Sequence, residues 1–312
     1  MKNFGSKIKR VFLFLAVNML VMLTLSIVIQ ALGLTGGRTA NGYNLPSLLG
    51  FCLVWGMGGA FISLAMSKIM AKWMMGVKII DPKTTNAEER WLVDTTYRFA
   101  RAAGLTSMPE VGYYESPEVN AFATGPTKNR SLVAVSSGLM SNMDRQAVEG
   151  VIGHEVAHVA NGDMVTMTLI QGVINAFVMA LARLVAFAIS NFMKSDDDRE
   201  GGGLGPLAYS LTVMALEMVF MLLGSIVVMW FSRQREFRAD QGGARYAGRE
   251  AMIGALRSLQ KATDYNFKVN EQTEQKPAFA SLKISASKPG LAGLFRTHPT
   301  LEERIQRLER MR

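Results

Sequence analysis

The sequence predicts a mainly helical α+β fold, in which a four-helix membrane anchor carries an extramembrane domain with a small β-sheet. Three observations lead to this class. Hydrophobic residues make up 49% of the 312 residues, charged residues only 19%, and the mean hydropathy is positive. Four apolar stretches reach the roughly 18 residues that a spanning helix needs, at 11–34, 45–67, 164–193 and 204–231. The segments between them carry the capped and alternating patterns of a folded domain.

These stretches divide the chain into four parts. Residues 1–68 are expected to form a membrane hairpin of two helices, and residues 164–231 a second pair. Residues 69–163 and 232–312 then form the two halves of one extramembrane domain, which the second pair interrupts.

Arg183 and Glu217 interrupt the third and fourth stretches. Charges within a membrane are costly and usually face a protein interior, so these two residues could pair with each other. A buried pair of core helices, partial insertion, or a cavity facing the cytosol would also accommodate them.

The basic residues predict the orientation in a bacterial inner membrane. The first stretch reads as an uncleaved anchor, and cytoplasmic flanks are typically rich in Lys and Arg. Such residues precede the first stretch and follow the second and fourth, at Lys2, Lys7, Lys9, Arg10, Lys68, Lys72, Lys78, Arg233, Arg235 and Arg238. The extramembrane domain is therefore expected in the cytoplasm, in contact with the lipid bilayer. These flanks account for the net charge of +9, and no nucleic-acid partner is expected. The only cysteine, Cys52, lies in an apolar stretch, which excludes disulfides and argues against thiol ligation.

The strongest chemical signal is the segment Gly153-His154-Glu155-Val156-Ala157-His158. Two His four residues apart lie on one face of a helix, where their rings can bind one metal ion, and zinc is the usual one. Glu155 follows the first His, as in zinc peptidases where such a Glu takes a proton from the attacking water and passes it to the leaving amine. An amphipathic helix with incidental histidines is the alternative, but the chain has only three His. Asn142 or Asp144 can cap this helix, and Gly162 can end it.

A catalytic zinc needs one further protein ligand, and Glu236 is the best candidate. It lies on a continuation of the fourth apolar stretch, with Asp240 one helical turn later on the same face. Asp240 could accept the second ring N–H of a ligating His and so orient it. The alternative for this run is a solvated charged face. Because the ligands directly flank the second membrane pair, the site is expected near the membrane surface.

Three short strands are predicted beside the metal helix, at 109–114, 120–125 and 131–136, after a helix over 86–103. An edge strand formed by Asn120, Ala121, Phe122 and Ala123 could bind an extended substrate through its backbone. These strands could equally be only scaffold.

The last part of the chain offers one more candidate. Residues 261–290 are polar with little periodicity and are predicted to form a loop or lid. Thr300 and Glu303 begin a docked C-terminal helix with an apolar stripe. His298 just before it could donate a hydrogen bond to the oxyanion that forms during hydrolysis, or could simply pack ahead of a turn.

The sequence resembles the HtpX family of bacterial membrane zinc metalloproteases, relatives of the CAAX prenyl proteases. The resemblance covers nearly the whole chain and is carried by the His154–His158 segment with Asn161-Gly162-Asp163, by 236–244, by 120–125 and by Thr297-His298-Pro299. It implies a zincin-like (gluzincin) domain with one Zn²⁺ per chain, which cleaves damaged membrane proteins and unfolded polypeptides in stress-linked quality control. Other membrane quality-control proteins are the further partners that it implies.

Two other functions are weaker. A non-catalytic membrane scaffold or holdase would need a fourth protein ligand to close a structural zinc site, and the sequence places no spare His or Cys for it. A small transporter using Arg183 and Glu217 should have more polar residues in its apolar helices and would not need Glu155.

Overall fold

The computed structural model describes residues 42–193, 203–273 and 296–311, together with scattered residues between 19 and 39. Its contacts divide the chain into two compact units. Unit 1 comprises Met1–Ser63 and Met167–Val228, and unit 2 comprises Leu64–Thr166 and Met229–Arg312. Assignment of the four expected segments to membrane and catalytic parts stays a prediction.

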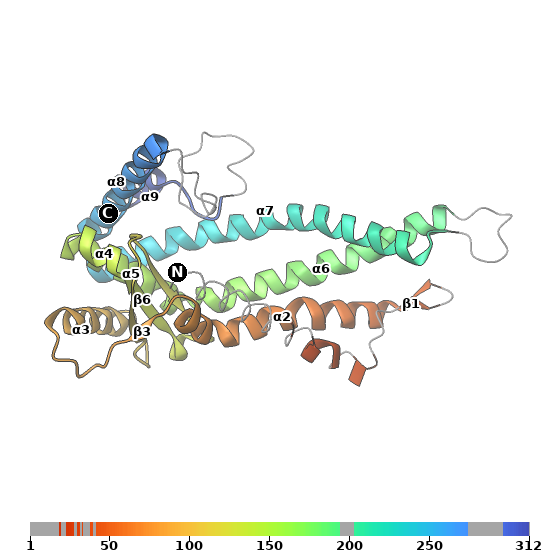
Figure 1. Cartoon of the computed structure of the whole chain (residues 1–312), viewed down its shortest axis with the longest axis horizontal. Helices are drawn as coiled ribbons and strands as arrows, with labels where there is room; N and C mark the ends of the chain where they lie inside the picture. Colours follow the sequence, from red (N-terminus) through yellow and green to blue (C-terminus); the bar gives the residue numbers. More distant parts are fainter. Residues whose placement is uncertain are drawn as a thin grey trace. The chain divides into compact units, whose positions relative to one another are not determined.

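Three long helices dominate unit 1: α2 (Leu45–Met74), α6 (Asp163–Phe192) and α7 (Pro206–Ala247), labelled in Figure 1. Each is long and apolar enough to cross a membrane, although only 17%, 33% and 6% of the residues in their apolar windows are buried. A pair of core helices would bury its apolar side chains, so the alternative of a buried pair is wrong. Exposed apolar faces of this length indicate contact with lipid. Most of the first expected span, 11–34, lies outside the described residues and stays a prediction.

Inside unit 1, α6 and α7 are joined by the ion pair that the sequence offered as one option. Arg183 Nη1 donates to Glu217 Oε1 at 2.6 Å and to the carbonyl oxygen of Met179 at 2.9 Å. The helices α2 and α6 also approach closely, since a Cβ on Gly56 would lie 2.5 Å from the backbone nitrogen of Ala176. Small residues at such crossings are typical of membrane helices.

Unit 2 is built on a four-stranded sheet with the order β3-β4-β6-β5. The strands are β3 (Lys78–Ile79), β4 (Glu110–Tyr114), β5 (Ala121–Thr124) and β6 (Leu132–Ser136). β4 and β6 run parallel, while β3 and β5 are antiparallel edge strands. The three expected strands are thus confirmed as β4, β5 and β6, and β5 does lie at an edge. The remaining strands, β1 (Arg38–Thr39) and β2 (Gly42–Tyr43), form a separate two-stranded pair.

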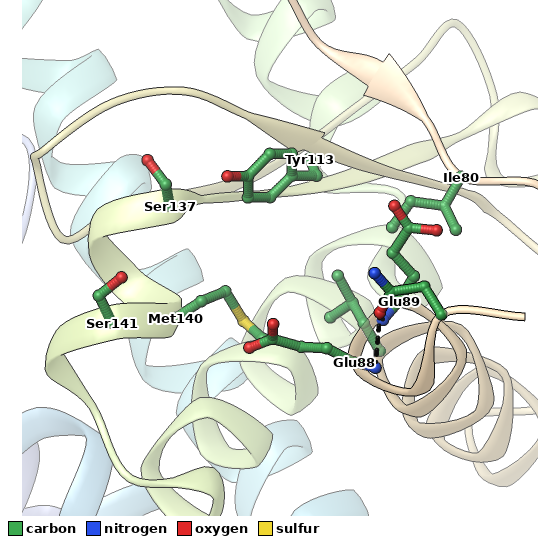
Figure 2. A pocket seen from close by; sticks show the side chains of 9 residues that line it. Ile80, Glu88, Glu89, Tyr113, Ser137, Met140 and Ser141 are labelled. Atoms are coloured by element: carbon green, nitrogen blue, oxygen red, sulfur yellow. Dashed lines mark hydrogen bonds between the residues drawn. The ribbon is translucent and has the colours of Figure 1, made fainter. Parts of the chain in front are cut away.

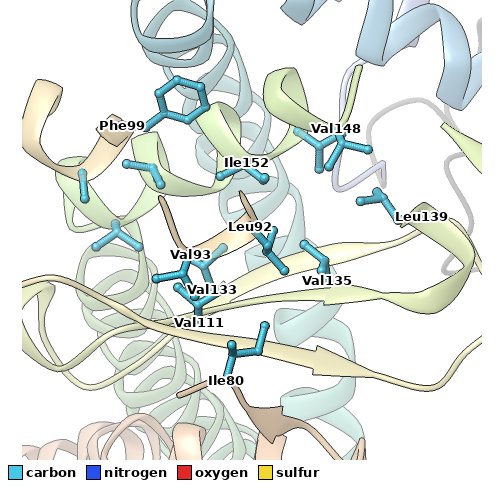
Figure 3. Close-up of a cluster of buried hydrophobic side chains, with 14 of the residues drawn as sticks. Ile80, Leu92, Val93, Phe99, Val111, Val133, Val135, Leu139, Val148 and Ile152 are labelled. Carbon is cyan, nitrogen blue, oxygen red and sulfur yellow. The ribbon is translucent and has the colours of Figure 1, made fainter. Parts of the chain in front are cut away.

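The side chains of β6 alternate between the two faces of the sheet, and both faces are buried. Val133 and Val135 belong to the main core, whereas Leu132 and Ala134 face a smaller cluster that includes Ala71 of α2. The main core packs the sheet against α3 (Ala87–Ala102) and α5 (Arg145–Asn161), as Figure 3 shows. The sheet therefore holds α5, the helix with the two His, by one buried face.

A polar side chain caps the start of α3, and a glycine follows its end. Asn86 Oδ1 accepts the backbone N–H groups of Glu88 and Glu89, as expected for a helix N-cap. The side chain of Glu89 accepts a hydrogen bond from the Thr84 hydroxyl at 2.6 Å. The helix ends before Gly104, whose φ is +73°.

The remaining helices of unit 2 complete the domain. They are η1 (Lys128–Arg130), α4 (Ser137–Asn142), α8 (Arg249–Thr273) and α9 (Leu301–Glu309). α9 is the expected docked helix, since Leu301, Ile305 and Leu308 are buried against α8. The prediction of a loop from residue 261 is wrong up to Thr273, because α8 continues through it. Lys, Gln and Glu are good helix formers, so a polar run without apolar periodicity can still be helical. Residues 274–290 of that loop lie outside the described residues.

Candidate metal centre

The helix α5 places its two His by firm caps and close packing. Asp144 accepts the backbone N–H of Ala147 at 2.7 Å, and Gly162 ends the helix with a φ of +71°. A Cβ on Gly243 of α7 would lie 3.0 Å from the backbone nitrogen of His154. The glycine therefore lets α7 approach α5 at the level of the first His.

That close approach brings three side chains together. His154, His158 and Glu236 each offer a ligand atom within 4.8 Å of the others. The two Nε2 atoms are 3.1 Å apart, and each lies 3.5 Å from an oxygen of Glu236. Glu236 is only 1% exposed, so the solvated charged face considered for its helix is not what the structure has here.

A carboxylate holds the outer nitrogen of each ring. Asp240 Oδ1 lies 3.0 Å from Nδ1 of His154, and Asp163 Oδ2 lies 2.7 Å from Nδ1 of His158. Each carboxylate favours a proton on Nδ1, which leaves the lone pair of Nε2 directed toward Glu236. Asp240 was a sequence candidate for this position. The sequence analysis includes Asp163 only as part of the family resemblance. The one local feature that could have indicated it is an acidic residue five positions after the second His.

This donor set fits zinc. Two imidazole Nε2 atoms and a carboxylate converge on one point, where all three could bind one metal ion. Among the residues that the structure describes, no fourth His, Cys, Asp or Glu joins the group. Three protein ligands with one position left open are the arrangement of a catalytic site, whereas a structural zinc site is closed by four.

Electrostatics around the group also favour a cation. Burial lowers the pKa of His154, but its hydrogen bonds to Asp240 and Glu236 outweigh this effect and raise the pKa to about 9. For Glu236, burial raises the pKa, whereas the neighbouring His154 and His298 rings bring it well below its usual range. The site thus keeps its carboxylate ionised and stabilises positive charge beside it.

Arg304 of α9 is a member of this site that the sequence did not reveal. It is 4% exposed and binds both oxygens of Asp240, from Nη2 at 2.6 Å and from Nε at 2.8 Å. Its Nη2 also lies 3.4 Å from Nδ1 of His154. The guanidinium therefore fixes the carboxylate that contacts the ring, and the C-terminal helix becomes part of the candidate metal site.

The other sequence candidates lie around this group. Glu155 is half-buried on α5, next to His154 in the chain. His298 Nδ1 lies 3.0 Å from Glu236 Oε2, without the alignment of a hydrogen bond.

Ala121, Phe122 and Ala123 form part of the edge strand β5, which packs against α5 and is half-buried. Asn120 precedes the strand, and its backbone pairs with Ser136 of β6. Among the described residues, no hydrogen bond or ion pair joins this strand to His154, His158 or Glu236.

A pocket of about 260 Å³ also lies in unit 2, and none of its lining residues belongs to the metal group. Figure 2 shows Glu88 and Glu89 of α3 on one side and Tyr113 and Ser137 on the other. Met140 of α4 reaches between them.

Comparison with known proteins gives consistent results. Residues 86–312 match the family model described as Peptidase family M48. A protease HtpX homolog of Bacillus velezensis is 52% identical over 307 residues, covering 96% of this chain and 99% of that protein. A protease HtpX of Shewanella halifaxensis is 50% identical over 300 residues, covering 96% and 99%.

A solved structure resembles the fold as well. The crystal structure of S. mikatae Ste24p has a TM-score of 0.58 at 16% identity, over 94% of this chain. The chain spans 65% of the length of that structure. At this identity the resemblance concerns the fold alone.

Proposed function

This chain belongs to peptidase family M48 and is a membrane metalloprotease, and we propose that it is a zinc-dependent endopeptidase that cleaves damaged or misfolded membrane proteins at the cytoplasmic face of a bacterial inner membrane. The observation that carries the proposal is the convergence of His154, His158 and Glu236 within 4.8 Å. These three residues would hold the zinc. When bound, zinc polarises the scissile carbonyl and acidifies the attacking water.

The remaining residues of the site handle protons and orientation. Glu155 takes the proton of the attacking water and passes it to the leaving amine, because it follows a ligand without being one. Asp240 and Asp163 hold the rings of His154 and His158, and Arg304 holds Asp240.

Two roles are considered for His298, which contacts Glu236. With Nδ1 against Glu236, its Nε2 could donate to the oxyanion of the substrate. If it only packs there, its loss should alter metal binding rather than turnover. We favour donation, because the ring borders the ligand and is partly open to solvent.

The substrate class follows from the edge strand. β5 pairs with β6 on one side only, so its other edge can add an extended polypeptide. Backbone pairing depends little on sequence, which suits unfolded segments of many proteins, and Asn120 to Ala123 would supply it. The helices α2, α6 and α7 bring such substrates within reach in the lipid bilayer, and other membrane quality-control proteins are the expected partners.

The two non-enzymatic alternatives have less support. A scaffold or holdase with structural zinc would use a closed set of four ligands, which the described residues do not offer. A transporter using Arg183 and Glu217 would not need Glu155 or the group formed by His154, His158 and Glu236.

Removal of metal tests the proposed cofactor. Purified full-length protein should lose cleavage of an unfolded substrate such as casein after treatment with a zinc chelator, and Zn²⁺ should restore it where Mg²⁺ does not. Because zinc binds only the folded site, a concentration 1,000 times the dissociation constant should add about 4 kcal/mol to the free energy of unfolding. Thermal unfolding with and without zinc measures this separately from activity. Full activity in metal-free protein would contradict the proposal.

Reporter fusions test the orientation. Fusions after Asp81 and after Arg312 should both report the cytoplasm, because Lys68, Lys72, Lys78 and Arg233 flank the apolar helices on that side. A fusion after Thr39 serves as the control and should report the opposite side. A periplasmic signal after Asp81 or Arg312 would reject this topology.

A further inference from the structure

The pocket of unit 2 lies at the carboxyl ends of the two parallel strands, β4 and β6. Tyr113 is the last residue but one of β4, and Ser137 directly follows β6. The helices α3 and α4 border it, as Figure 2 shows. Crevices at this end of parallel strands are where α/β proteins usually bind ligands. One water molecule takes up about 30 Å³ of liquid, so the pocket has room for a whole side chain.

Part of the lining is apolar and buried. Ile80 and Leu92 line the pocket and belong to the main core, with 5% and 2% of their surfaces exposed. Met140 of α4 adds a third apolar side chain. A bare metal ion gains nothing from such a lining, because Mg²⁺ and Ca²⁺ bind six or more oxygen atoms. The lining instead favours an occupant with an aliphatic stem.

Two carboxylates, Glu88 and Glu89, are the only charged groups that line the pocket. Glu89 accepts one hydrogen bond at Oε2, from the hydroxyl of Thr84. The carboxylate of Glu88 has no hydrogen bond or ion pair with any residue that the structure describes. The lining therefore carries two negative charges that no Lys or Arg of the pocket balances, in a chain whose net charge is +9.

Tyr113 lies across the pocket from these carboxylates (Figure 2). Its hydroxyl donates a hydrogen bond of 2.7 Å to Glu115. This hydrogen bond raises the pKa of Tyr113, and the charge of Glu88 adds to the rise, so both walls of the pocket lie in a negative field. The face of an aromatic ring also attracts positive charge. Carboxylates on one wall and a tyrosine on the other are complementary to a cation.

We propose that this pocket binds the side chain of a Lys or Arg residue of a polypeptide substrate, with the aliphatic stem on the apolar lining and the charge between the carboxylates and the Tyr113 ring. The inference rests on the proposed function, in which the substrates are membrane proteins. Cytoplasmic flanks of membrane proteins are rich in Lys and Arg, so such a substrate brings a suitable side chain to the domain. None of the lining residues belongs to the metal group, so the pocket would hold the substrate away from the cleaved bond.

A small free amine or a divalent metal ion would also be attracted by two carboxylates. The polypeptide is favoured because the pocket combines its charge with an apolar lining and is open at its rim, where Glu88 and Ser141 are exposed. A side chain can therefore enter while its backbone stays outside. Butylamine and Mg²⁺ are included in the test as competitors.

The binding test uses the full-length, zinc-loaded Glu155→Gln protein in detergent, so that the probes are not cleaved. The probes are fluorescent peptides that differ only in one central residue, which is Lys, Arg, acetyl-lysine, Gln or Glu. We expect the Lys and Arg peptides to bind about 3–30-fold more tightly than the acetyl-lysine and Gln peptides, the range for one partly exposed ion pair together with one cation–π contact. Fluorescence anisotropy measures the dissociation constants.

Variants in the same background assign the preference to the pocket. Glu88→Gln combined with Glu89→Gln removes the charge and should bring the ratio of Lys to acetyl-lysine affinity toward one. Ser141→Trp fills the cavity, leaves both carboxylates in place and should remove the same preference. Glu250→Gln is the matched control, because Glu250 is exposed and is the second residue of α8, as Glu88 is of α3. Melting curves identify a double variant that fails to fold, in which case Glu88→Gln alone decides, since it keeps the contact between Glu89 and its neighbour.

Turnover of the parent protein gives a second readout. A cleavable peptide carries the Lys or the acetyl-lysine segment at the end of a flexible Gly/Ser linker. Because the pocket would bind substrate away from the metal, Lys should lower KM by a similar factor and leave kcat unchanged. In the Ser141→Trp protein both peptides should have the higher KM.

The outcomes separate this inference from the proposed function. Equal affinity for Lys and acetyl-lysine peptides would overturn the pocket and leave the peptidase intact. A Lys preference that survives the loss of both carboxylates, or that survives Ser141→Trp, would also overturn it, because the attraction would then be a general property of the surface. Competition by butylamine or Mg²⁺ at the concentration of the Lys peptide would overturn the polypeptide as the occupant. If no peptide is cleaved, the proposed function fails, while a Lys preference lost in the pocket variants would still support the pocket.

Discussion

The Glu155→Gln protein should bind zinc like the parent but cleave substrate about 10²–10⁴-fold more slowly, the range for a lost general base. Glutamine has nearly the size of glutamate and cannot accept the proton of the attacking water. The three candidate ligands, His154, His158 and Glu236, are untouched, so the metal content should not change. Turnover of casein and elemental analysis of the purified variant measure the two effects.

Glu149→Gln provides the matched control for this variant. Glu149 lies on the same helix and pairs with Arg98 near the surface at 2.9 Å, a kind of contact that contributes little. Its turnover should stay close to that of the parent. Substantial cleavage by the Glu155→Gln protein would mean that another group takes the proton.

Local patterns in the sequence were enough to predict the helix with the two His. Asp144, Gly162 and the spacing of His154 and His158 all act within one helix, so no tertiary information is needed to read them. The position of Glu236 beside the two His could be expected for a different reason. A catalytic zinc requires a third ligand, and few acidic residues follow the last apolar stretch at a suitable place.

Arg304 could not be predicted, because nothing local distinguishes it. It lies 150 residues after His154 and reads as a charged residue of an amphipathic helix with an exposed polar face. Only the packing of α9 against α8 directs it inward, where it meets Asp240. Tertiary packing decides such contacts, and short motifs do not contain them.

The prediction of a loop after residue 261, where α8 continues to Thr273, was wrong for a related reason. Apolar periodicity indicates that a helix buries a face, and its absence after residue 261 suggested a loop. A helix needs no buried face along its whole length once a packed segment has begun it, and α8 packs through Met252 and Leu256. The packed first part of α8 therefore nucleates the helix, and the polar residues that follow extend it.

Loss of Glu236 should have the largest effect on the metal itself. Glu236 is 1% exposed and is one of the three proposed ligands. Glu236→Ala should therefore lose zinc during dialysis or in competition with a chelator. Asp240→Ala removes only the partner of His154 Nδ1 and should weaken zinc affinity or activity by about 10–100-fold. Zinc affinity should fall further in Glu236→Ala than in Asp240→Ala, because Glu236 would bind the metal directly whereas Asp240 only orients the ring of His154.

The free energy of unfolding gives a second comparison of the two variants. Asp240→Ala leaves Arg304 buried without its carboxylate, and breaking a buried ion pair in this way costs about 3–5 kcal/mol, so this metal-free protein should melt well below the metal-free parent. Glu236→Ala also takes a carboxylate from buried cations, because Arg235 and Arg304 lie 3.3 and 3.7 Å from Glu236, so this variant should melt below the metal-free parent as well. Glu250→Ala, which removes an exposed acid on α8, is the control for both. All three should still insert in the membrane, because α2 and α6 are unchanged and the apolar part of α7 is intact. If Glu236→Ala retains zinc as tightly as the parent in a chelator titration, the third ligand lies elsewhere in the chain.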